Sequence, residues 1–556
     1  MNSRHGSLRW LVGLLSLLAI AAGSWQLEAA SSGLVVTRQW LGTMPVTVFR
    51  PAAAAGQPAK AAPVLLVAHG FAGSQQLMQP FATTLARSGW LVITFDFPGH
   101  GRNSAPMRGG LQDTRLSQQT LLAAMDQVAV LARTWAQAGQ SGNSAAPVAG
   151  YAVLGHSMAS DIVVRHAQAH PEVFATVGLS LFAPSIQVGT AANSPRNLLV
   201  ISGALEPAMM ATEALRVVGL SASAGVGQGA AALGQTVGNF AQGTARRAVL
   251  APGVEHISVL YSATSLAETR AWLAAAAGQP LLAGGFIDAR GPALGWLLLG
   301  VVGLAWPLSG GLPLLISPAL LAAQQPRARG HTRTRSHTRS PTRTRWWRWP
   351  APALVAVLPA LLTPLLLWPL PTKLLPLLLG DYLLLHFALY GLLSAATSLL
   401  LVRRAPRLPP GSGRALLLAI GLATAYALLA VGLPLDRYVF NLQPGLVRLP
   451  LIAALCAGTL PYFWADEAWT RDPAAPPAAY LVSKLCFLLS LVAAIALNPG
   501  RLFFLAIIVP AILVLFVVYG LFSRWIFRRT GVPLVAAVAN ALVFACFIGA
   551  TFPLVA

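Results

Sequence analysis

Long apolar runs fill the second half of this chain and constrain its fold more than any other feature. They recur from residue 292 to residue 556 and are broken by short basic loops. A helix needs about 20 apolar residues to cross a bilayer. Charged residues make up only 10% of the chain, against about 25% in soluble proteins. Residues 30–290 have an ordinary mixed composition, so the sequence predicts one water-soluble part and one part in lipid.

Nine crossings are expected, one before the mixed part and about eight after it. Their approximate bounds are Trp10–Ser24, Ala293–Leu314, Ala353–Leu370, Leu375–Val402, Ala415–Leu433, Leu449–Trp464, Tyr480–Ala496, Leu502–Phe522 and Pro533–Leu554. The first run is either a cleaved signal peptide or an uncleaved anchor, and the lack of a strong small-x-small cleavage site favours the anchor. The predicted domains are a signal anchor or signal peptide at 1–29, a mixed domain at 30–290, and a polytopic membrane domain at 291–556 with a basic cytoplasmic loop at 324–350.

Three arginine clusters predict the orientation of these crossings. They lie in the loop 324–350, at 403–407 after the fourth crossing, and at 524–529 after the eighth. Alternation from a cytoplasmic N-terminus places all three clusters in the cytoplasm, as the excess of Lys and Arg in cytoplasmic loops requires. The same alternation places residues 30–290 outside the cytoplasm. The sequence therefore predicts a multi-pass protein of a bacterial cytoplasmic (inner) membrane, with its mixed domain on the extracytoplasmic side.

The net charge of +22 also suggests a nucleic-acid ligand, but much of it lies in loops between apolar runs. Orientation in the membrane explains it, and no nucleic-acid partner is expected. The basic stretch Arg327–Arg345 is interpreted in the same way, rather than as a nucleic-acid or lipid-phosphate binder. The three cysteines, Cys456, Cys486 and Cys546, all fall in the apolar half. The mixed part therefore has no disulfide, and cysteine usage does not report its compartment.

Strands and helices alternate along the mixed part. Apolar strands are predicted at Val64–Ala68 and Leu91–Phe95, with helices at Gln79–Ser88 and Ser117–Ala138. Further strands are predicted at Val148–Leu154, Phe174–Leu181, Asn197–Ser202 and Ala245–Leu250, and further helices at Met158–His170 and Ser265–Ala276. Alternation of this kind is typical of βαβ units, so the fold class is α/β with a mostly parallel sheet flanked by helices, followed by an all-α transmembrane domain.

A sharp strand-to-helix turn is predicted at Gly155-His156-Ser157-Met158-Ala159. The pattern small-x-Ser-x-small places a serine hydroxyl in the open, because the backbone of such a turn passes close to its neighbours. His69-Gly70-Phe71 follows an earlier strand, and Asp96-Phe97-Pro98-Gly99-His100-Gly101 follows the next. Together, and in this order, the three motifs resemble the α/β-hydrolase family (serine esterase or lipase type) over about residues 34–277. Ala159 stands where the family more often has glycine.

The resemblance implies a catalytic triad in the chain order serine, acid, histidine. Ser157 would be the nucleophile, Glu206 the acid in a position where aspartate is usual, and His256 the base. Asp161 is an alternative acid by residue type. Backbone N–H groups of Phe71 and Met158 would form the oxyanion hole. His69 and His100 are expected to support loop geometry, His156 to pack beside Ser157, and Glu255 to lie on the surface.

These residues predict a membrane-bound serine hydrolase that cleaves carboxylic esters, with small-molecule or lipid esters as substrates and membrane lipids as surroundings. The same triad serves a serine peptidase or an acyltransferase, and the sequence does not separate them. Phe182–Asn197 is short for a lid, which predicts an open site. No metal-ligand spacing or phosphate-binding glycine loop is evident, so no cofactor and no metal are expected; the oligomeric state is left open.

Ionisable residues inside the apolar half allow a second hypothesis. Asp381 and His386 lie within the fourth crossing, and charged groups in lipid are functional candidates. They either pair with other helices or mark a path for lipid, proton or substrate. Asp466 and Glu467 are placed at the cytoplasmic end of the sixth crossing, and Lys484 is expected to reach the cytoplasmic surface. The alternative function is therefore a transport or scaffolding protein with a non-catalytic hydrolase-like domain.

Overall fold

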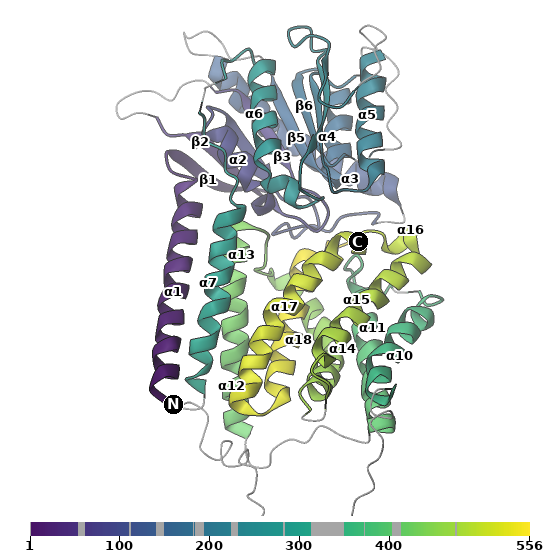
Figure 1. Cartoon of the computed structure of the whole chain (residues 1–556). Helices are drawn as coiled ribbons and strands as arrows, with labels where there is room; N and C mark the ends of the chain where they lie inside the picture. The colour runs from purple at the N-terminus through teal and green to yellow at the C-terminus, as the bar shows by residue number, and fades with distance from the viewer. Residues whose placement is uncertain are drawn as a thin grey trace, which may run out of the picture. The chain divides into compact units, whose positions relative to one another are not determined.

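The computed structural model (Figure 1) divides the chain into two compact units, which are described separately. It describes residues 2–53, 62–110, 113–140, 150–181, 183, 194–223, 232–281, 284–312, 350–371, 373–402, 413–472 and 475–556. The sheet unit comprises Ala22–Trp296, Pro434–Gly445 and Ala550–Ala556. The helical unit comprises Met1–Ala21, Leu297–Leu433 and Leu446–Gly549. The domain boundaries drawn at residues 30 and 290 stay a prediction. The structure adds two short C-terminal segments to the sheet unit.

A nine-stranded sheet forms the centre of the sheet unit, in the order β1-β2-β4-β3-β5-β6-β7-β9-β8. The strands are β1 (Leu34–Leu41), β2 (Met44–Pro51), β3 (Val64–Ala68), β4 (Leu91–Phe95), β5 (Tyr151–His156), β6 (Val173–Leu179), β7 (Leu198–Gly203), β8 (Thr236–Val237) and β9 (Arg246–Ala251). All pairs from β4 to β9 are parallel, whereas β1, β2 and β8 pair antiparallel at the edges. The predicted α/β class with a mostly parallel sheet is confirmed.

Helices cover both faces of this sheet. Because side chains alternate along a strand, Leu199 packs with α2 (Gln79–Ala86) and α6 (Ala263–Ala276), whereas Val200 packs with α4 (Met158–Ala169) and α5 (Ala208–Ser223). A further helix, α3 (Thr114–Gln140), packs on α4 and β3. Fully buried apolar strands of this kind need cover on both sides, which is why the parallel strands read as continuous apolar runs. Their carboxyl ends share one edge.

Eight helices of the described residues are long and apolar enough to cross a membrane. They belong to α1 (Asn2–Ala29), α7 (Gly291–Ser309), α11 (Gly380–Thr397), α12 (Gly413–Tyr426) with its continuation to Tyr438, α14 (Leu449–Thr470), α15 (Ala479–Leu497), α17 (Leu505–Thr530) and α18 (Pro533–Thr551). Large apolar side chains are exposed on them, such as Leu417 at 70%. The expected ninth, α10 (Pro350–Leu367), is present as a shorter apolar helix containing two prolines.

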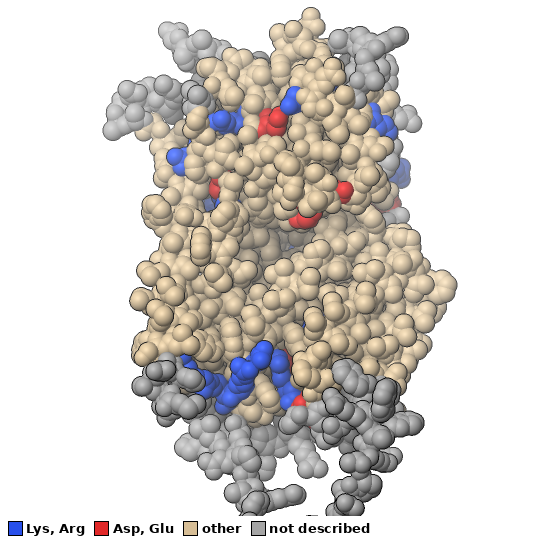
Figure 2. All heavy atoms as spheres, in the orientation of Figure 1, with Lys and Arg blue, Asp and Glu red and all other residues tan. Residues whose placement is uncertain are grey.

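Basic side chains gather at one end of the helical unit, where α12 begins and α17 ends (Figure 2). Arg528 and Arg529 lie in the last turn of α17, where positive charge also suits the helix dipole. The surface between this end and the opposite end of the helices carries few charges (Figure 2). The predicted basic loop at 324–350 and the cluster at 403–407 lie almost entirely outside the described residues.

Two buried ion pairs lie among the described residues of the helical unit. Lys484 Nζ lies 2.6 Å from Asp466 Oδ2 and 3.2 Å from the Tyr462 hydroxyl, and the Lys484 side chain is 5% exposed. The prediction that Lys484 reaches the surface is wrong, because a buried carboxylate one helix away offers it a partner. Glu467 pairs with Arg471 at 3.0 Å.

The two ionisable residues of the fourth expected crossing lie in α11. Asp381 Oδ1 accepts a hydrogen bond from the Tyr382 N–H at 2.7 Å. His386 Nδ1 lies 3.4 Å from the Tyr382 hydroxyl, and within the described residues His386 Nε2 has no hydrogen-bond partner. Neither residue forms an ion pair with another helix in the part of the chain that is described.

Candidate active site

The strand-to-helix turn after β5 has the strained backbone that its sequence predicts. Ser157 has φ 54° and ψ −119°, a region that non-glycine residues rarely occupy. A Cβ on Gly155 would lie 2.3 Å from the Ala159 carbonyl oxygen, so only glycine fits there. Alanine is tolerated at position 159, where the residue is fully buried. The turn therefore lifts Ser157 off the end of β5 at the start of α4.

Three side chains distant in sequence meet at this turn. His256 Nε2 lies 2.8 Å from Ser157 Oγ, and His256 Nδ1 lies 2.5 Å from Glu206 Oε1. Ser157 follows β5, Glu206 follows β7 and His256 follows β9, so all three come from the carboxyl ends of parallel strands. An imidazole bridging a hydroxyl and a carboxylate is the arrangement that makes a serine nucleophilic.

Glu206 is held on both carboxylate oxygens. Oε1 contacts His256, while Oε2 accepts hydrogen bonds from the Gly203 N–H at 2.6 Å and the Ser180 hydroxyl at 3.0 Å. Its side chain is 1% exposed, against 19% for His256. The longer arm of glutamate, compared with aspartate, is therefore fixed in one direction by the loop after β7.

His156 braces the loop that carries His256. Its Nε2 lies 2.9 Å from the His256 carbonyl oxygen, and the two rings are 5.1 Å apart. Burial, assisted by the neighbouring His256, lowers the pKa of His156 to about 3. His156 is thus neutral at ordinary pH, and its ring N–H donates to that carbonyl.

The turn after β3 passes directly beside Ser157. A Cβ on Gly70 would lie 2.9 Å from the Ser157 Cβ, so glycine permits this approach. His69 is fully buried and fixes the turn: its Nε2 accepts from the Phe97 N–H at 3.1 Å, which leaves Nδ1–H to donate to the Gly70 carbonyl at 2.8 Å. Burial lowers the pKa of His69 and favours this neutral form. The candidate oxyanion donors are two backbone N–H groups. One belongs to Phe71 in this turn, and the other to Met158 directly after Ser157.

The loop after β4 is organised by the buried Asp96. Its carboxylate accepts hydrogen bonds from the Gln75 N–H at 2.7 Å and the Arg102 N–H at 2.9 Å. The His100 ring lies 5.3 Å from His69 and 6.2 Å from Phe71. His69 and His100 therefore support the loops around Phe71, in the roles expected of them.

Segment 434–445 packs against this loop, an arrangement not anticipated from the sequence. Asp436 Oδ2 lies 2.7 Å from Arg102 Nη2, and Asn441 Oδ1 accepts from Arg102 Nε at 3.1 Å. Asn441 also donates to the Gly101 carbonyl at 3.1 Å. This segment comprises the end of α13 (Gly432–Tyr438) and the turn after it, and neither carries a sequence signal for such a distant partner.

The C-terminal segment 550–556 pairs with the same loop. Leu554 N–H donates to the Gly99 carbonyl at 2.9 Å, and the Met107 N–H donates to the Leu554 carbonyl at 2.8 Å. A Cβ on Gly99, whose φ is 78°, would lie 2.3 Å from that Leu554 oxygen. Phe552 is 2% exposed and places its ring edge-on to Phe71 at 6.4 Å. This segment thus borders the candidate oxyanion turn.

Two other acidic candidates lie apart from His256. Asp161 pairs with Arg165 at 2.9 Å and accepts from Gln118 at 3.0 Å. Glu255 caps the turn that follows it, accepting from the Ile257 and Ser258 N–H groups. Much of Phe182–Asn197 lies outside the described residues, so the predicted open site stays a prediction.

Residues 59–222 match the family described as serine aminopeptidase, S33. No curated protein matches the chain. Similar solved structures include a predicted CIB-like hydrolase from Thermoplasma acidophilum (13% identity, 41% of this chain and 92% of that chain, TM-score 0.29). Others are a membrane phospholipase A, titled a novel bacterial virulence factor (15%, 48% and 97%, 0.28), and the thioesterase domain from the curacin biosynthetic pathway (23%, 28% and 48%, 0.20).

Proposed function

Because the sheet unit carries an α/β-hydrolase domain, we propose that this chain is a membrane-bound serine hydrolase that cleaves carboxylic esters, including lipid-linked acyl groups. Ser157 is the nucleophile, His256 the general base and Glu206 the residue that orients His256. The observation that carries the proposal is the pair of contacts made by His256, 2.8 Å to Ser157 Oγ and 2.5 Å to Glu206 Oε1.

In the first half-reaction, Ser157 Oγ attacks the ester carbonyl carbon while its proton passes to His256 Nε2. The Phe71 and Met158 N–H groups stabilise the oxyanion, and a donor of this kind contributes about 3–4 kcal/mol to the transition state. When the C–O bond to the leaving group breaks, His256 returns the proton to the departing alkoxide. An alcohol leaves and the acyl group remains on Ser157.

In the second half-reaction, water replaces the alcohol. His256 takes a proton from the water as its oxygen attacks the acyl carbon, and the new tetrahedral intermediate uses the same two donors. Collapse returns the proton to Ser157 Oγ and releases the carboxylic acid. Glu206 keeps the proton of His256 on Nδ1 throughout, so that Nε2 is free to accept.

The grouping of segments supports an extracytoplasmic position for the hydrolase domain. Segments on one side of a membrane are separated by an even number of crossings. Four described apolar helices, α7, α10, α11 and α12, separate Trp296 from Pro434, and four, α14, α15, α17 and α18, separate Gly445 from Ala550. Residues 434–445 and 550–556 both belong to the sheet unit. Alternation requires this grouping if α10 crosses the membrane. Its 18 residues are enough, and the basic end of α17 then faces the cytoplasm.

Two segments next to apolar helices contact the loops around Phe71, and they favour lipid-linked substrates. Phe552 packs on Phe71 and follows directly after α18, an apolar helix that ends at Thr551. Asp436 of segment 434–445 contacts Arg102. This segment likewise joins two apolar helices. The loops beside Ser157 are therefore joined in the chain to apolar helices, which makes lipid-linked acyl esters the first substrates to test.

The test is covalent labelling of the full-length protein in detergent with a fluorophosphonate, followed by hydrolysis of nitrophenyl esters of increasing chain length and of a phospholipid. We expect labelling of wild-type protein, its loss in Ser157→Ala, and retention in Ser160→Ala, a nearby serine. Failure of folded wild-type protein to label would overturn the proposal.

Peptide cleavage is the second candidate, favoured by the description of the matching family as serine aminopeptidases. Ester and amide substrates pass through the same acyl-enzyme. Aminoacyl nitroanilides in the same assay separate the two, because an aminopeptidase prefers them to simple esters and requires a free amino group.

A further inference from the structure

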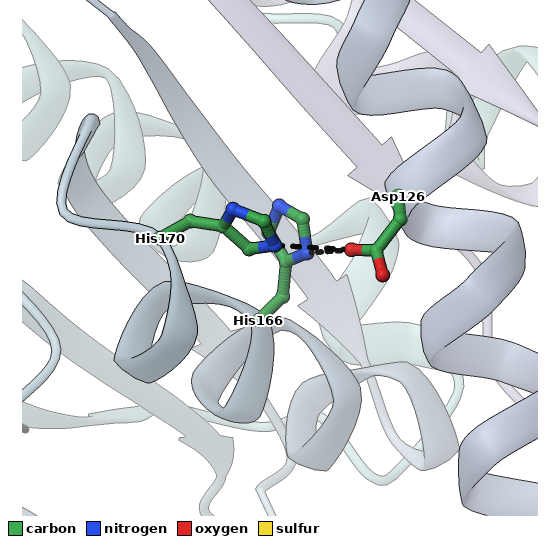
Figure 3. A group of neighbouring side chains, drawn as sticks. All are labelled: Asp126, His166 and His170. Atoms are coloured by element: carbon green, nitrogen blue, oxygen red, sulfur yellow. Dashed lines mark hydrogen bonds and ion pairs between the residues drawn. The ribbon is translucent and has the colours of Figure 1, made fainter.

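Two histidines and an aspartate come together in the hydrolase domain away from Ser157 (Figure 3). His166 lies in the last turn of α4, and His170 directly follows that helix. Asp126 projects toward them from α3 (Figure 3). Ser157 precedes α4, and at about 1.5 Å per residue the nine residues to His166 separate the cluster from the serine by about 14 Å. The cluster is therefore distinct from the catalytic site.

Both histidines bring one ring nitrogen close to the same carboxylate oxygen. Asp126 Oδ1 lies 2.9 Å from His166 Nδ1 and 3.1 Å from His170 Nε2. His166 Nδ1 is buried and, despite the short distance, is not aligned for a hydrogen bond to any described residue. All three ligand atoms lie within 4.8 Å of one another. In a tetrahedral zinc site, with bonds of about 2.0–2.1 Å, ligand atoms are about 3.3 Å apart, so small side-chain rotations suffice.

We propose that Asp126, His166 and His170 form a binding site for a divalent cation of the zinc type. Two imidazoles and one carboxylate suit zinc and its neighbours among the transition metals better than magnesium or calcium. Three protein ligands leave a fourth position for water, and the half-exposed Asp126 carboxylate leaves a path for entry. No step of ester hydrolysis passes through this ion.

The second nitrogen of each histidine already has the partner that a metal ligand needs. His166 Nε2 lies 2.8 Å from the Tyr151 hydroxyl, and His170 Nδ1 lies 3.4 Å from Glu172 Oε1. Glu172 is itself held by Arg133 at 3.0 Å. Such outer contacts fix the ring orientation and the tautomer, and their loss typically weakens metal binding about 10- to 100-fold.

The place of the site suggests what the ion does. The carboxyl end of α4 carries the negative end of the helix dipole, which favours a cation there. A bound ion would tie the end of α4 to α3, and α4 begins directly after Ser157. We therefore expect metal binding to stabilise the domain without supplying a catalytic group.

The spacing His166-x-x-x-His170 is short enough to read in the sequence, but two histidines alone are weak evidence for a metal. Asp126 lies 40 positions earlier and reaches the pair only because α3 packs on α4. That packing is the information that the sequence lacked, and it is why no metal site was expected.

The experiment uses the full-length protein without a histidine tag, stripped with a chelator in detergent. Zn²⁺ affinity is measured by competition with a chromophoric chelator, and Co²⁺ binding by its visible absorption. We expect one high-affinity ion per chain and the intense absorption of tetrahedral Co²⁺ in wild type. Asp126→Asn and His170→Ala should weaken Zn²⁺ binding at least 100-fold, and Glu172→Gln about 10-fold.

His256→Ala is the matched control, since it removes a histidine at the catalytic site and should leave Zn²⁺ affinity unchanged. Zn²⁺ should raise the thermal midpoint of wild type but not of His170→Ala. His170 and Asp126 are partly exposed, so these variants should fold; His166→Ala is secondary because His166 is buried. Absence of stoichiometric Zn²⁺ binding in wild type, or equal binding by wild type and both Asp126→Asn and His170→Ala, would overturn the proposal.

Discussion

In the sheet unit, the buried carboxylate of Glu206 contacts His256, and the chain of contacts ends at the partly exposed hydroxyl of Ser157. In the helical unit, the buried carboxylate of Asp466 contacts Lys484, and both ends of that pair are buried. In the proposed triad, the first carboxylate orients the base that takes up the proton of Ser157 during the reaction. The second neutralises a fixed cation.

Under the proposed function, this difference separates a site suited to proton transfer from a pair that only compensates buried charges. A triad needs a member that changes charge during the reaction and a path for substrate. A buried ion pair needs only mutual compensation, because either charge alone would be strongly destabilising. Breaking the Glu206–His256 contact should therefore lower activity and leave folding intact. Breaking the Asp466–Lys484 pair should impair folding and leave the activity of the folded protein unchanged.

The largest effect is expected from Glu206→Gln. A glutamine keeps the shape but not the charge that stabilises protonated His256, and the corresponding change in a Ser-His-Asp triad lowers kcat about 10⁴-fold. The thermal midpoint should change little. Glu255→Gln is the matched control, because Glu255 is adjacent to His256 but caps a surface turn; it should retain activity within about twofold. Similar losses in the two variants would argue against Glu206 as the orienting acid.

Lys484→Met should give the converse result. It leaves Asp466 buried without its counter-ion, which destabilises a protein by about 3–5 kcal/mol. We expect lower yield and a lower thermal midpoint, but unchanged kcat per labelled active site. Adding Asp466→Asn should restore much of the stability. Leu485→Ala, at an exposed position of the same helix, is the control and should matter far less.

Sequence patterns predicted those parts of the hydrolase domain whose signals are local. Strands Val64–Ala68 and Leu91–Phe95 have the predicted bounds, because each is a short apolar run bounded by turn residues. The turn at Ser157 was readable because only small residues fit its backbone. The edge strand β8 was not predicted, because its two residues are too short to leave a pattern.

Long-range pairing explains what the sequence did not predict. Arg102 and Asp436 are 334 positions apart, and neither is unusual in its own surroundings. The same holds for Phe552 beside Phe71 and for Asp466 beside Lys484. Each pair depends on how separate helices or loops pack, and hydrophobic periodicity carries no information about side-chain partners of that kind.

Phe552→Ala tests whether segment 550–556 matters to the catalytic side of the comparison. The substitution removes the T-shaped ring contact with Phe71, whose N–H is the proposed oxyanion donor. Loss of such a donor lowers kcat about 10²- to 10³-fold, and a loosened donor should lose about 10-fold. The expected change is in kcat, normalised by fluorophosphonate titration, with KM little affected. Val555→Ala, in the same segment, is the control. Equal kcat for Phe552→Ala and wild type would assign Phe552 a purely structural role.

The smallest effect is a pH dependence confined to the hydrolase domain. His156 has a pKa of about 3 in the folded state, lowered chiefly by burial, against 6.5 as the reference value. Between these values the unfolded chain binds the extra proton, so stability is full above about pH 6.5 and declines as the pH falls. At pH 5.5 this residue alone accounts for about 1.4 kcal/mol. His156→Gln keeps a donor toward the His256 carbonyl and removes the titration. Its thermal midpoint should therefore fall less between pH 8 and pH 5.5 than that of wild type, and an unchanged slope would mean that His156 is accessible to protons in the folded protein.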